Sequence, residues 1–177
     1  MSKAKWVIDP SHSLVEFSVK HMMIATVKGR FGQFQGTILA DLANLTTAEF
    51  EGTIEAASID TRDAGRDEHL RSADFFDVAQ FPQLTFKSKR LTLAGEDEFK
   101  LTGDLTMHGV TQEVVLDLTF EGQGKDPWGN IRAGFTAETR VNRKEFGLTW
   151  NAVLETGGVL VGDQVRIALQ IEAIQQA

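Results

Sequence analysis

The densest group of ionisable side chains lies in residues 62–82, which read RDAGRDEHLRSADFFDVAQFP. Its consecutive Asp67, Glu68 and His69 are residue types that can exchange protons or bind a metal ion. In a helix, however, adjacent residues point to different faces, whereas residues three or four apart are neighbours. The spacing therefore predicts an ordinary surface ion pair between Asp67 and Arg71 rather than a catalytic or metal site.

Other motifs that could carry chemistry are absent from the sequence. Its four histidines, at positions 12, 21, 69 and 108, show no His-x-His or HExxH spacing. There is no Cys and no G-x-S-x-G motif, and the glycine-containing runs match neither the dinucleotide-binding fingerprint nor the P-loop. We therefore expect no metal, no cofactor and no catalytic residue. One enzymatic alternative stays open, in which His69 or His21 acts with nearby carboxylates on a small molecule.

The charge balance limits the partners that this protein can have. Asp and Glu outnumber Lys and Arg by 25 to 18, which gives a net charge of -7. Nucleic-acid binders carry a basic stripe, and none is visible here, so we expect no nucleic-acid partner. The same charge disfavours an anionic membrane surface. No run approaches the ~20 apolar residues of a membrane span, so stable membrane insertion is not expected. The N-terminus has no apolar segment typical of a signal peptide, which predicts a cytoplasmic protein.

Alternating apolar and polar side chains run through most of the sequence and predict β-strands. In SLVEFSVKH, for example, Val15, Phe17 and Val19 alternate with polar neighbours. Short turn signals such as His108–Gly109 separate the runs, which favours an all-β, antiparallel up-and-down arrangement. About eight strands is a number at which a closed barrel can hold one small ligand. Without repeats or low-complexity tracts, residues 1–177 are predicted to form a single domain.

Two segments interrupt the alternation. Residues 62–76 predict a short helical segment with Thr61 or Asp63 as its N-cap, followed by Phe75 and Phe76 as an aromatic anchor. The second segment, HMMIATVKGRF at residues 21–31, is irregular and predicts a short helix or a loop. NRKEFGLTW reads as a capped turn between strands, although it could also offer Arg143 to a ligand.

The strand pattern predicts which side chains face the barrel interior. These are Phe17, Phe34, Ile54, Phe86, Leu101, Leu105, Leu116, Leu118, Phe135, Ile167 and Leu169. Such residues can fill a small barrel completely or line an apolar cavity, and the pattern alone favours neither outcome. A filled structural barrel that acts through protein partners therefore stays an alternative.

The order of several motifs resembles the YceI-like family over nearly the whole chain, from Trp6 to Ile174. The motifs are WVIDPSHSLVEFSVKH, VKGRFGQFQG, ASIDTRDAGRDEHLRSADFFDVAQFPQLTFKS, LTGDLTMHGVTQEV and VNRKEFGL. This resemblance implies an elongated, lipocalin-like barrel with a long apolar channel and no enzymatic activity. It also implies a polyisoprenoid or other long-chain amphiphile as ligand, such as a fatty-acyl lipid, and the possibility of a homodimer.

Under this interpretation the interior residues would hold the apolar chain, because each buried CH₂ contributes ~0.8 kcal/mol. A phosphate head group would need Arg or His donors. Arg30, Arg66, His69 and Arg143 are the candidates for that contact. The leading hypothesis is therefore a non-catalytic carrier of a long-chain amphiphile.

Overall fold

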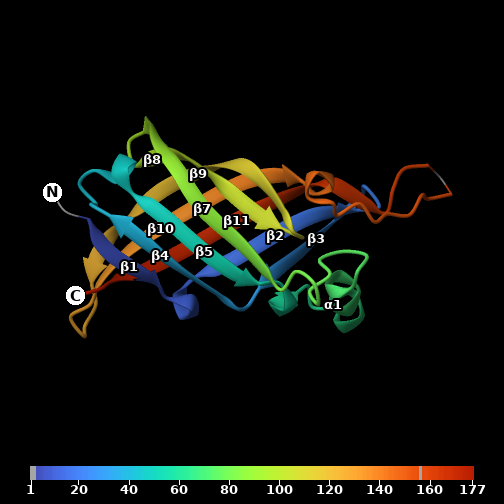
Figure 1. Ribbon diagram of the computed structural model, residues 1–177, viewed down its shortest axis with the longest axis horizontal. Helices are drawn as coiled ribbons and strands as arrows, with labels where there is room; N and C mark the ends of the chain where they lie inside the picture. The colour runs from blue at the N-terminus through green and yellow to red at the C-terminus, as the bar shows by residue number, and fades with distance from the viewer. Residues whose placement is uncertain (1–2, 156) are drawn as a thin grey trace.

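The computed structural model describes residues 3–155 and 157–177 and shows an elongated antiparallel β-barrel (Figure 1). The strands are β1 (Ala4–Ile8), β2 (Leu14–His21), β3 (Ala25–Phe31), β4 (Phe34–Ala40), β5 (Glu49–Glu55), β6 (Ile59–Asp60), β7 (Gln83–Gly95), β8 (Glu98–Met107), β9 (Val110–Lys125), β10 (Ile131–Asn142) and β11 (Val161–Gln175). The helical elements are α1 (Ala64–Arg71) and the short 3-10 turns η1 (Pro10–His12), η2 (Leu45–Thr47), η3 (Ala56–Ser58) and η4 (Arg143–Phe146).

The barrel is closed by β1, which pairs with β4 on one side and with β11 on the other. The hydrogen-bonded ring follows the order β1-β4-β5-β7-β8-β9-β10-β11. β2, β3 and β6 continue three of these strands beyond a bend, because η1 separates β1 from β2 and η3 separates β5 from β6. This arrangement confirms the all-β, antiparallel, lipocalin-like barrel of about eight strands that the sequence predicts.

The hairpin of β8 and β9 shows why the alternating pattern gives this fold. Its register runs from Glu98 opposite Thr119 to Met107 opposite Val110. The connecting residues are His108 and Gly109, with φ values of 56° and 72°. Two positive φ values match the twist of the flanking strands, so a two-residue turn holds the register without strain on the pairing.

The prediction of a short helix or loop at residues 21–31 holds for the turn at residues 22–24 and is wrong for residues 25–31. Residues 25–31 form β3, which pairs with β2 from His21 opposite Ala25 to Glu16 opposite Arg30. The irregular composition has a tertiary cause, because the ring of Phe17 lies over Gly29 and would clash with any Cβ there. Gly29 therefore interrupts the apolar pattern without interrupting the strand.

The helix predicted in residues 62–76 is confirmed as α1, with Asp63 as its N-cap accepting a hydrogen bond from Arg66 N at 2.9 Å. The predicted surface pair between Asp67 and Arg71 is wrong. Asp67 is buried and accepts hydrogen bonds from Thr61 N (2.8 Å) and Thr61 Oγ1 (2.5 Å). Arg71 instead donates to the carbonyl oxygen of Ala57 at 2.9 Å. Both residues thus tie the helix to the barrel instead of to each other.

The two ends of the barrel differ in construction. At the end that carries both chain termini, β1 and β11 pair and complete the ring (Figure 1); we call it the closed end. At the other end, α1 and the segments of residues 72–82, 147–155 and 157–160 lie around the strand ends; we call it the open end. In the described part of the chain, no helix is both long and apolar enough to cross a bilayer.

Candidate functional site

A cavity of about 250 Å³ lies inside the barrel. Its wall includes all of the residues that the strand pattern predicts to face inward, namely Phe17, Phe34, Ile54, Phe86, Leu101, Leu105, Leu116, Leu118, Phe135, Ile167 and Leu169. The structure therefore brings these side chains together around one space, although their contact with a ligand stays a prediction. A barrel that surrounds such a space differs from one that is packed solid.

Further lining residues were missing from the predicted set. Val15, Val19 and Val114 also face the cavity, and the same alternation with Phe17 and Leu116 could have identified them. Phe31 was missed for another reason, because its strand was expected to be a loop. Its ring packs edge-on against Phe76 with the ring centroids 5.9 Å apart.

The cavity extends between two groups of buried side chains. One group lies toward the closed end and includes Trp6, Ile38 and Phe135. The other lies toward the open end and includes Phe31 and Phe146. Residues of both groups line the cavity, so its length follows the barrel axis. Most of its lining residues are aliphatic or aromatic, and Glu16, Glu51 and Arg143 are the charged residues among them.

The helix α1 and the segment of residues 72–82 that follows it cover part of the open end. We call this segment the strap. Leu70 of α1, together with Phe75 and Phe76 of the strap, lines the cavity. Each fully buried aromatic ring stabilises the fold by roughly 1.5–3 kcal/mol, more than an exposed ion pair. The strap is held further by hydrogen bonds from Phe76 N to the Leu70 oxygen and from Val78 N to the Arg71 oxygen. These contacts make the aromatic strap a wall of the cavity.

Arg143 is a charged residue in this apolar wall. It is 3% exposed and lines the cavity where η4 follows β10. Its guanidinium donates to the carbonyl oxygens of Gly162 (2.8 Å), Leu148 (2.6 Å), Trp150 (2.9 Å) and Val161 (3.3 Å). Its donors therefore order the backbone of residues 148–150 and 161–162 around the open end.

The charge of Arg143 has no direct counter-ion in residues 3–155 and 157–177, where no carboxylate oxygen lies within 4.0 Å of it. Burial lowers the pKa of Arg143 from its ordinary value, and the more distant Asp163 partly opposes that shift. Asp163 itself pairs with Lys144 at 3.3 Å. Because arginine stays protonated in proteins, the result is a buried positive charge solvated only by neutral carbonyls.

The other three head-group candidates are not among the residues that line the cavity. Arg30 is exposed and pairs with Asp60 at 3.5 Å. Arg66 is also exposed and donates to Thr61 Oγ1 (2.8 Å) and to the Thr61 carbonyl oxygen (2.7 Å). The structure thus brings Arg143 alone of the four candidates to the cavity wall, and the head-group role of all four stays a prediction.

His69 lies outside the cavity wall at the open end. Its Nε2 atom is 2.9 Å from Asp74 Oδ2, and its ring packs against Phe75 and Trp150. Both members of the pair are substantially exposed, at 39% and 53% of their side-chain surface. His21, at the end of β2, pairs with Val161 of β11. Neither histidine of the enzymatic alternative is among the residues that line the cavity.

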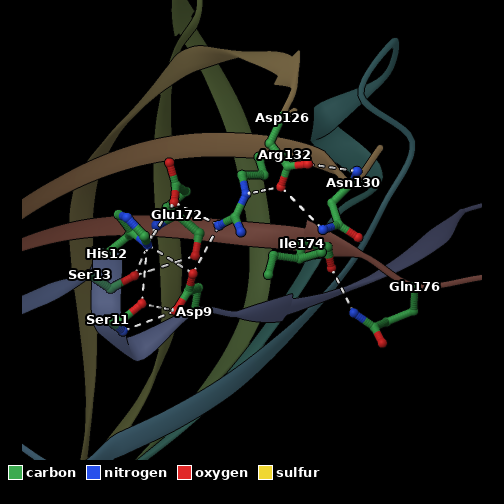
Figure 2. A network of polar contacts seen from close by, with 10 residues as sticks. All are labelled: Asp9, Ser11, His12, Ser13, Asp126, Asn130, Arg132, Glu172, Ile174 and Gln176. Atoms are coloured by element: carbon green, nitrogen blue, oxygen red, sulfur yellow. Dashed lines mark hydrogen bonds and ion pairs between the residues drawn. The ribbon is translucent and has the colours of Figure 1, made fainter. Parts of the chain in front are cut away.

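A polar network at the closed end joins β1, β10 and β11, as Figure 2 shows. Arg132 donates from Nε to Asp126 Oδ2 (2.8 Å) and from Nη1 to both Asp9 Oδ2 and Glu172 Oε2 (2.9 Å each). His12 Nδ1 lies 3.0 Å from Asp9 Oδ2. No sequence motif reveals this network, because its members are far apart in the chain and meet only through strand pairing.

Asp9, His12 and Glu172 could in principle bind a metal ion, since one ligand atom from each lies within 4.8 Å of the others. Arg132, however, already donates hydrogen bonds to two of these ligands, Asp9 and Glu172. Hydrogen bonds from Ser11 and Arg132 hold the pKa of Asp9 well below its usual range. The arrangement is therefore an ion-pair network in which the guanidinium takes the role of the cation.

The same network also lowers the pKa of Asp126. The hydrogen bond from Arg132, aided by backbone hydrogen bonds from Asn130 and Trp128, lowers the pKa of Asp126 to about 2. The carboxylates in turn raise the pKa of Arg132. Asp9, Asp126 and Arg132 are therefore ionised near neutral pH, and the guanidinium partly offsets the negative charge of the carboxylates around it.

Comparisons with known proteins agree with this architecture. The YceI-like domain matches residues 6–173. The chain is 39% identical over 175 residues to Protein YceI of Salmonella newport strain SL254, an alignment that covers 98% of this chain and 88% of that protein. The crystal structure of Burkholderia cenocepacia BcnA superposes with a TM-score of 0.82 at 25% identity, covering 93% of this chain and 98% of BcnA.

A second solved structure shares the fold at lower identity. It is described as a polyisoprenoid binding domain from Saccharophagus degradans implicated in plant cell wall breakdown. The TM-score is 0.72 at 14% identity, and the alignment covers 98% of this chain and 99% of that chain. At this identity, the likeness shows a common barrel.

Proposed function

Because the chain belongs to the YceI-like family, we propose that it is a non-catalytic carrier of a long-chain amphiphile whose apolar chain lies in the barrel cavity. A polyisoprenoid is the first candidate, because the related fold from Saccharophagus degradans is described as polyisoprenoid-binding. A fatty-acyl lipid has the same physical character and is the second candidate.

The apolar cavity is the observation that carries this proposal. Its wall is built from aliphatic and aromatic side chains along the barrel axis, and each CH₂ of a chain placed there contributes ~0.8 kcal/mol. The volume of about 250 Å³ is just below the roughly 300–1,000 Å³ of typical ligand pockets. A slender, flexible chain suits such a space better than a fused ring system.

Arg143 is the residue that we propose for contact with the polar head. It lines the cavity at the open end, and within residues 3–155 and 157–177 its guanidinium donates only to neutral carbonyl oxygens. An anionic or strongly polar head would supply the missing negative charge, and charge-assisted hydrogen bonds are stronger than neutral ones. A ligand could contact Arg30, Arg66 or His69 only if its head group extended beyond the cavity wall.

Uptake of a fluorescent fatty acid such as cis-parinaric acid tests the proposal directly, beside native mass spectrometry of the gently purified protein. Leu105 lines the cavity, so Leu105→Asp places a carboxylate in the apolar wall and should abolish uptake. Leu93 lies on β7 with 68% of its surface exposed, which makes Leu93→Asp a matched control that should bind as the wild type does.

Normal uptake by a soluble, folded Leu105→Asp protein would contradict the carrier proposal. Failure of the wild-type protein to bind either cis-parinaric acid or geranylgeraniol would favour the filled barrel that acts through protein partners. Catalytic turnover that His69→Ala abolishes while uptake persists would favour the enzymatic alternative. A co-purified prenyl or fatty-acyl compound, identified by its mass, would name the cargo.

A further inference from the structure

The turn between β2 and β3 places apolar side chains in solvent at the open end of the barrel. Met22, Met23 and Ile24 are 39%, 58% and 82% exposed. Val153, in the neighbouring segment of residues 151–160, is 85% exposed. We call these four residues the apolar tip. Figure 1 shows residues 151–155 and 157–160 projecting beyond the strands, opposite the chain termini.

Backbone hydrogen bonds join the two parts of the tip. Met22 N donates to the Leu160 oxygen at 2.8 Å, and Leu160 N donates to the Ala152 oxygen at 2.9 Å. Val153 then forms an isolated β-bridge with Val159. The turn and the segment are therefore one surface, and their exposed side chains belong to the same end of the molecule.

The backbone of this turn does not call for methionine. Met22 and Met23 have φ values of 53° and 61°, and Ile24 N donates to the His21 oxygen at 3.2 Å. A β-turn whose two central residues both have positive φ values strongly prefers Asn-Gly, because other side chains are disfavoured in this conformation. The methionines contribute neither to the core nor to the local geometry, so their chemistry is available to a partner outside the protein.

The charges beside the tip identify the partner. The β2–β3 hairpin contains one acidic residue, Glu16, which lies opposite Arg30 at the end away from the turn. From Phe17 to Ala40 the sequence has no Asp or Glu, despite the net charge of -7 of the whole chain. Lys20 and Lys28 lie on its exposed face, and within the described residues neither has a carboxylate oxygen within 4.0 Å. Glu155 is the acidic residue of the adjoining segment, so the local balance stays positive. Exposed apolar side chains flanked by lysines complement an anionic lipid surface.

The tip is also continuous with the cavity. Val19 lies three residues before Met22 and lines the cavity, as does Val161, which pairs with His21. A bilayer in contact with the tip would therefore lie beside the open end, where a lipid could pass between the bilayer and the cavity.

We propose that the apolar tip docks the open end of the barrel transiently on an anionic lipid bilayer, and that cargo exchanges with the bilayer there. The exchange rests on the proposed carrier function, whereas the docking does not. Met side chains suit this contact because they are flexible and polarisable and adapt to an irregular apolar surface. The lysines add an attraction that salt weakens.

The double variant Met22→Asn/Met23→Gly provides a sharp test, because it removes two apolar side chains and installs the residues that the turn prefers. Binding is measured by co-sedimentation with vesicles of equimolar phosphatidylglycerol and phosphatidylcholine. Exchange is measured as the rate at which cis-parinaric acid passes from the protein to these vesicles. We expect the unfolding temperature to be unchanged or higher and the affinity for cis-parinaric acid to be unchanged. Vesicle binding should become at least about tenfold weaker, and the transfer of cis-parinaric acid at least about tenfold slower.

Trp128 supplies the matched control. It is 82% exposed in the β9–β10 turn at the closed end, and tryptophan is favoured at membrane interfaces. Trp128→Ala should leave vesicle binding and transfer unchanged. In a second variant, Lys20→Gln/Lys28→Gln should weaken binding to the anionic vesicles and leave binding to pure phosphatidylcholine vesicles unchanged.

Vesicle binding that survives Met22→Asn/Met23→Gly, or that Trp128→Ala alone reduces, would overturn the proposal. The proposal would also be overturned if the wild-type protein did not bind vesicles and formed a dimer instead. Sedimentation would detect that dimer and its loss in the double variant. If cis-parinaric acid does not bind but the tip still docks on vesicles, the carrier function fails and the docking surface stands.

Discussion

The strand β10 has an arginine near each end, and their surroundings are opposite in character. Arg132, at the closed end, donates to Asp9, Asp126 and Glu172. Arg143, roughly 36 Å farther along the strand direction, donates to backbone carbonyl oxygens in the wall of an apolar cavity. Both are extensively hydrogen-bonded, but only Arg132 has its charge neutralised by these contacts.

This difference distinguishes a structural charge from one that can act on a ligand. Three carboxylates around Arg132 leave little field for another anion, and the network joins strands that close the barrel. The charge of Arg143 is desolvated and its direct partners are neutral, so an anion entering the cavity would gain from it. The charge of Arg132 is thus satisfied within the protein, whereas under our proposal the charge of Arg143 is neutralised by the head group of a bound ligand.

Arg143→Met tests the open end most severely. It removes the donors of four backbone carbonyls, so we expect the free energy of unfolding to fall by about 2–4 kcal/mol in urea denaturation. Under the head-group proposal, the variant should also bind a fatty acid roughly tenfold more weakly while its affinity for the matching fatty alcohol is unchanged.

Arg143→Lys is the control for that change, because it keeps the charge but has fewer donors for the carbonyls. It should retain the preference for the acid over the alcohol and lose part of the stability. Equal losses for acid and alcohol in both variants would show that Arg143 only supports the wall.

Asp67→Ala tests how firmly α1 is attached at the open end. The change leaves Thr61 N without the acceptor that it has in the buried contact, at a cost of about 1–3 kcal/mol in the free energy of unfolding. Exposed Glu68, on the same helix, is the control, and Glu68→Ala should stay within about 0.5 kcal/mol of wild type. Equal free energies of unfolding for the two variants in urea titrations would contradict the anchoring of α1 by Asp67.

Arg132→Met tests the closed end and should have the smallest effect, because its network is partly solvent-exposed. The pKa values of Asp9 and Asp126 are lowered in the folded protein, to about 2 for Asp126. Their contribution to stability is therefore fully present above the unfolded pKa of about 3.9 and is lost as the pH falls through the folded values.

Without Arg132 much of that contribution disappears at neutral pH. Thermal unfolding should therefore show the largest difference between wild type and Arg132→Met near neutral pH, and the difference should narrow below about pH 4. A difference that is constant from neutral pH to about pH 2.5 would show that the carboxylates do not act through Arg132. Uptake of cis-parinaric acid near neutral pH should not change, because Arg132 does not line the cavity.

Much of the fold could be predicted because strand alternation is a local property. The inward set from Phe17 to Leu169 needed no tertiary information, since side chains two residues apart share a face of a strand. The α1 helix was similarly visible through its cap at Asp63. The strand β3 could not be predicted in this way, because Gly29 interrupts its alternating pattern. The reason for a glycine there is the ring of Phe17, which lies on another strand.

For the candidate site, the sequence determined the chemistry of the wall and named Arg143 among four cationic candidates. Only the tertiary structure decided which of them reaches the cavity, that Asp67 bonds Thr61 instead of Arg71, and that Arg132 gathers carboxylates from distant positions. The alternation of side chains along a strand determines on which face of that strand a residue lies. The partners on neighbouring strands, and the burial that sets the energy of a charge, depend on how the whole barrel closes.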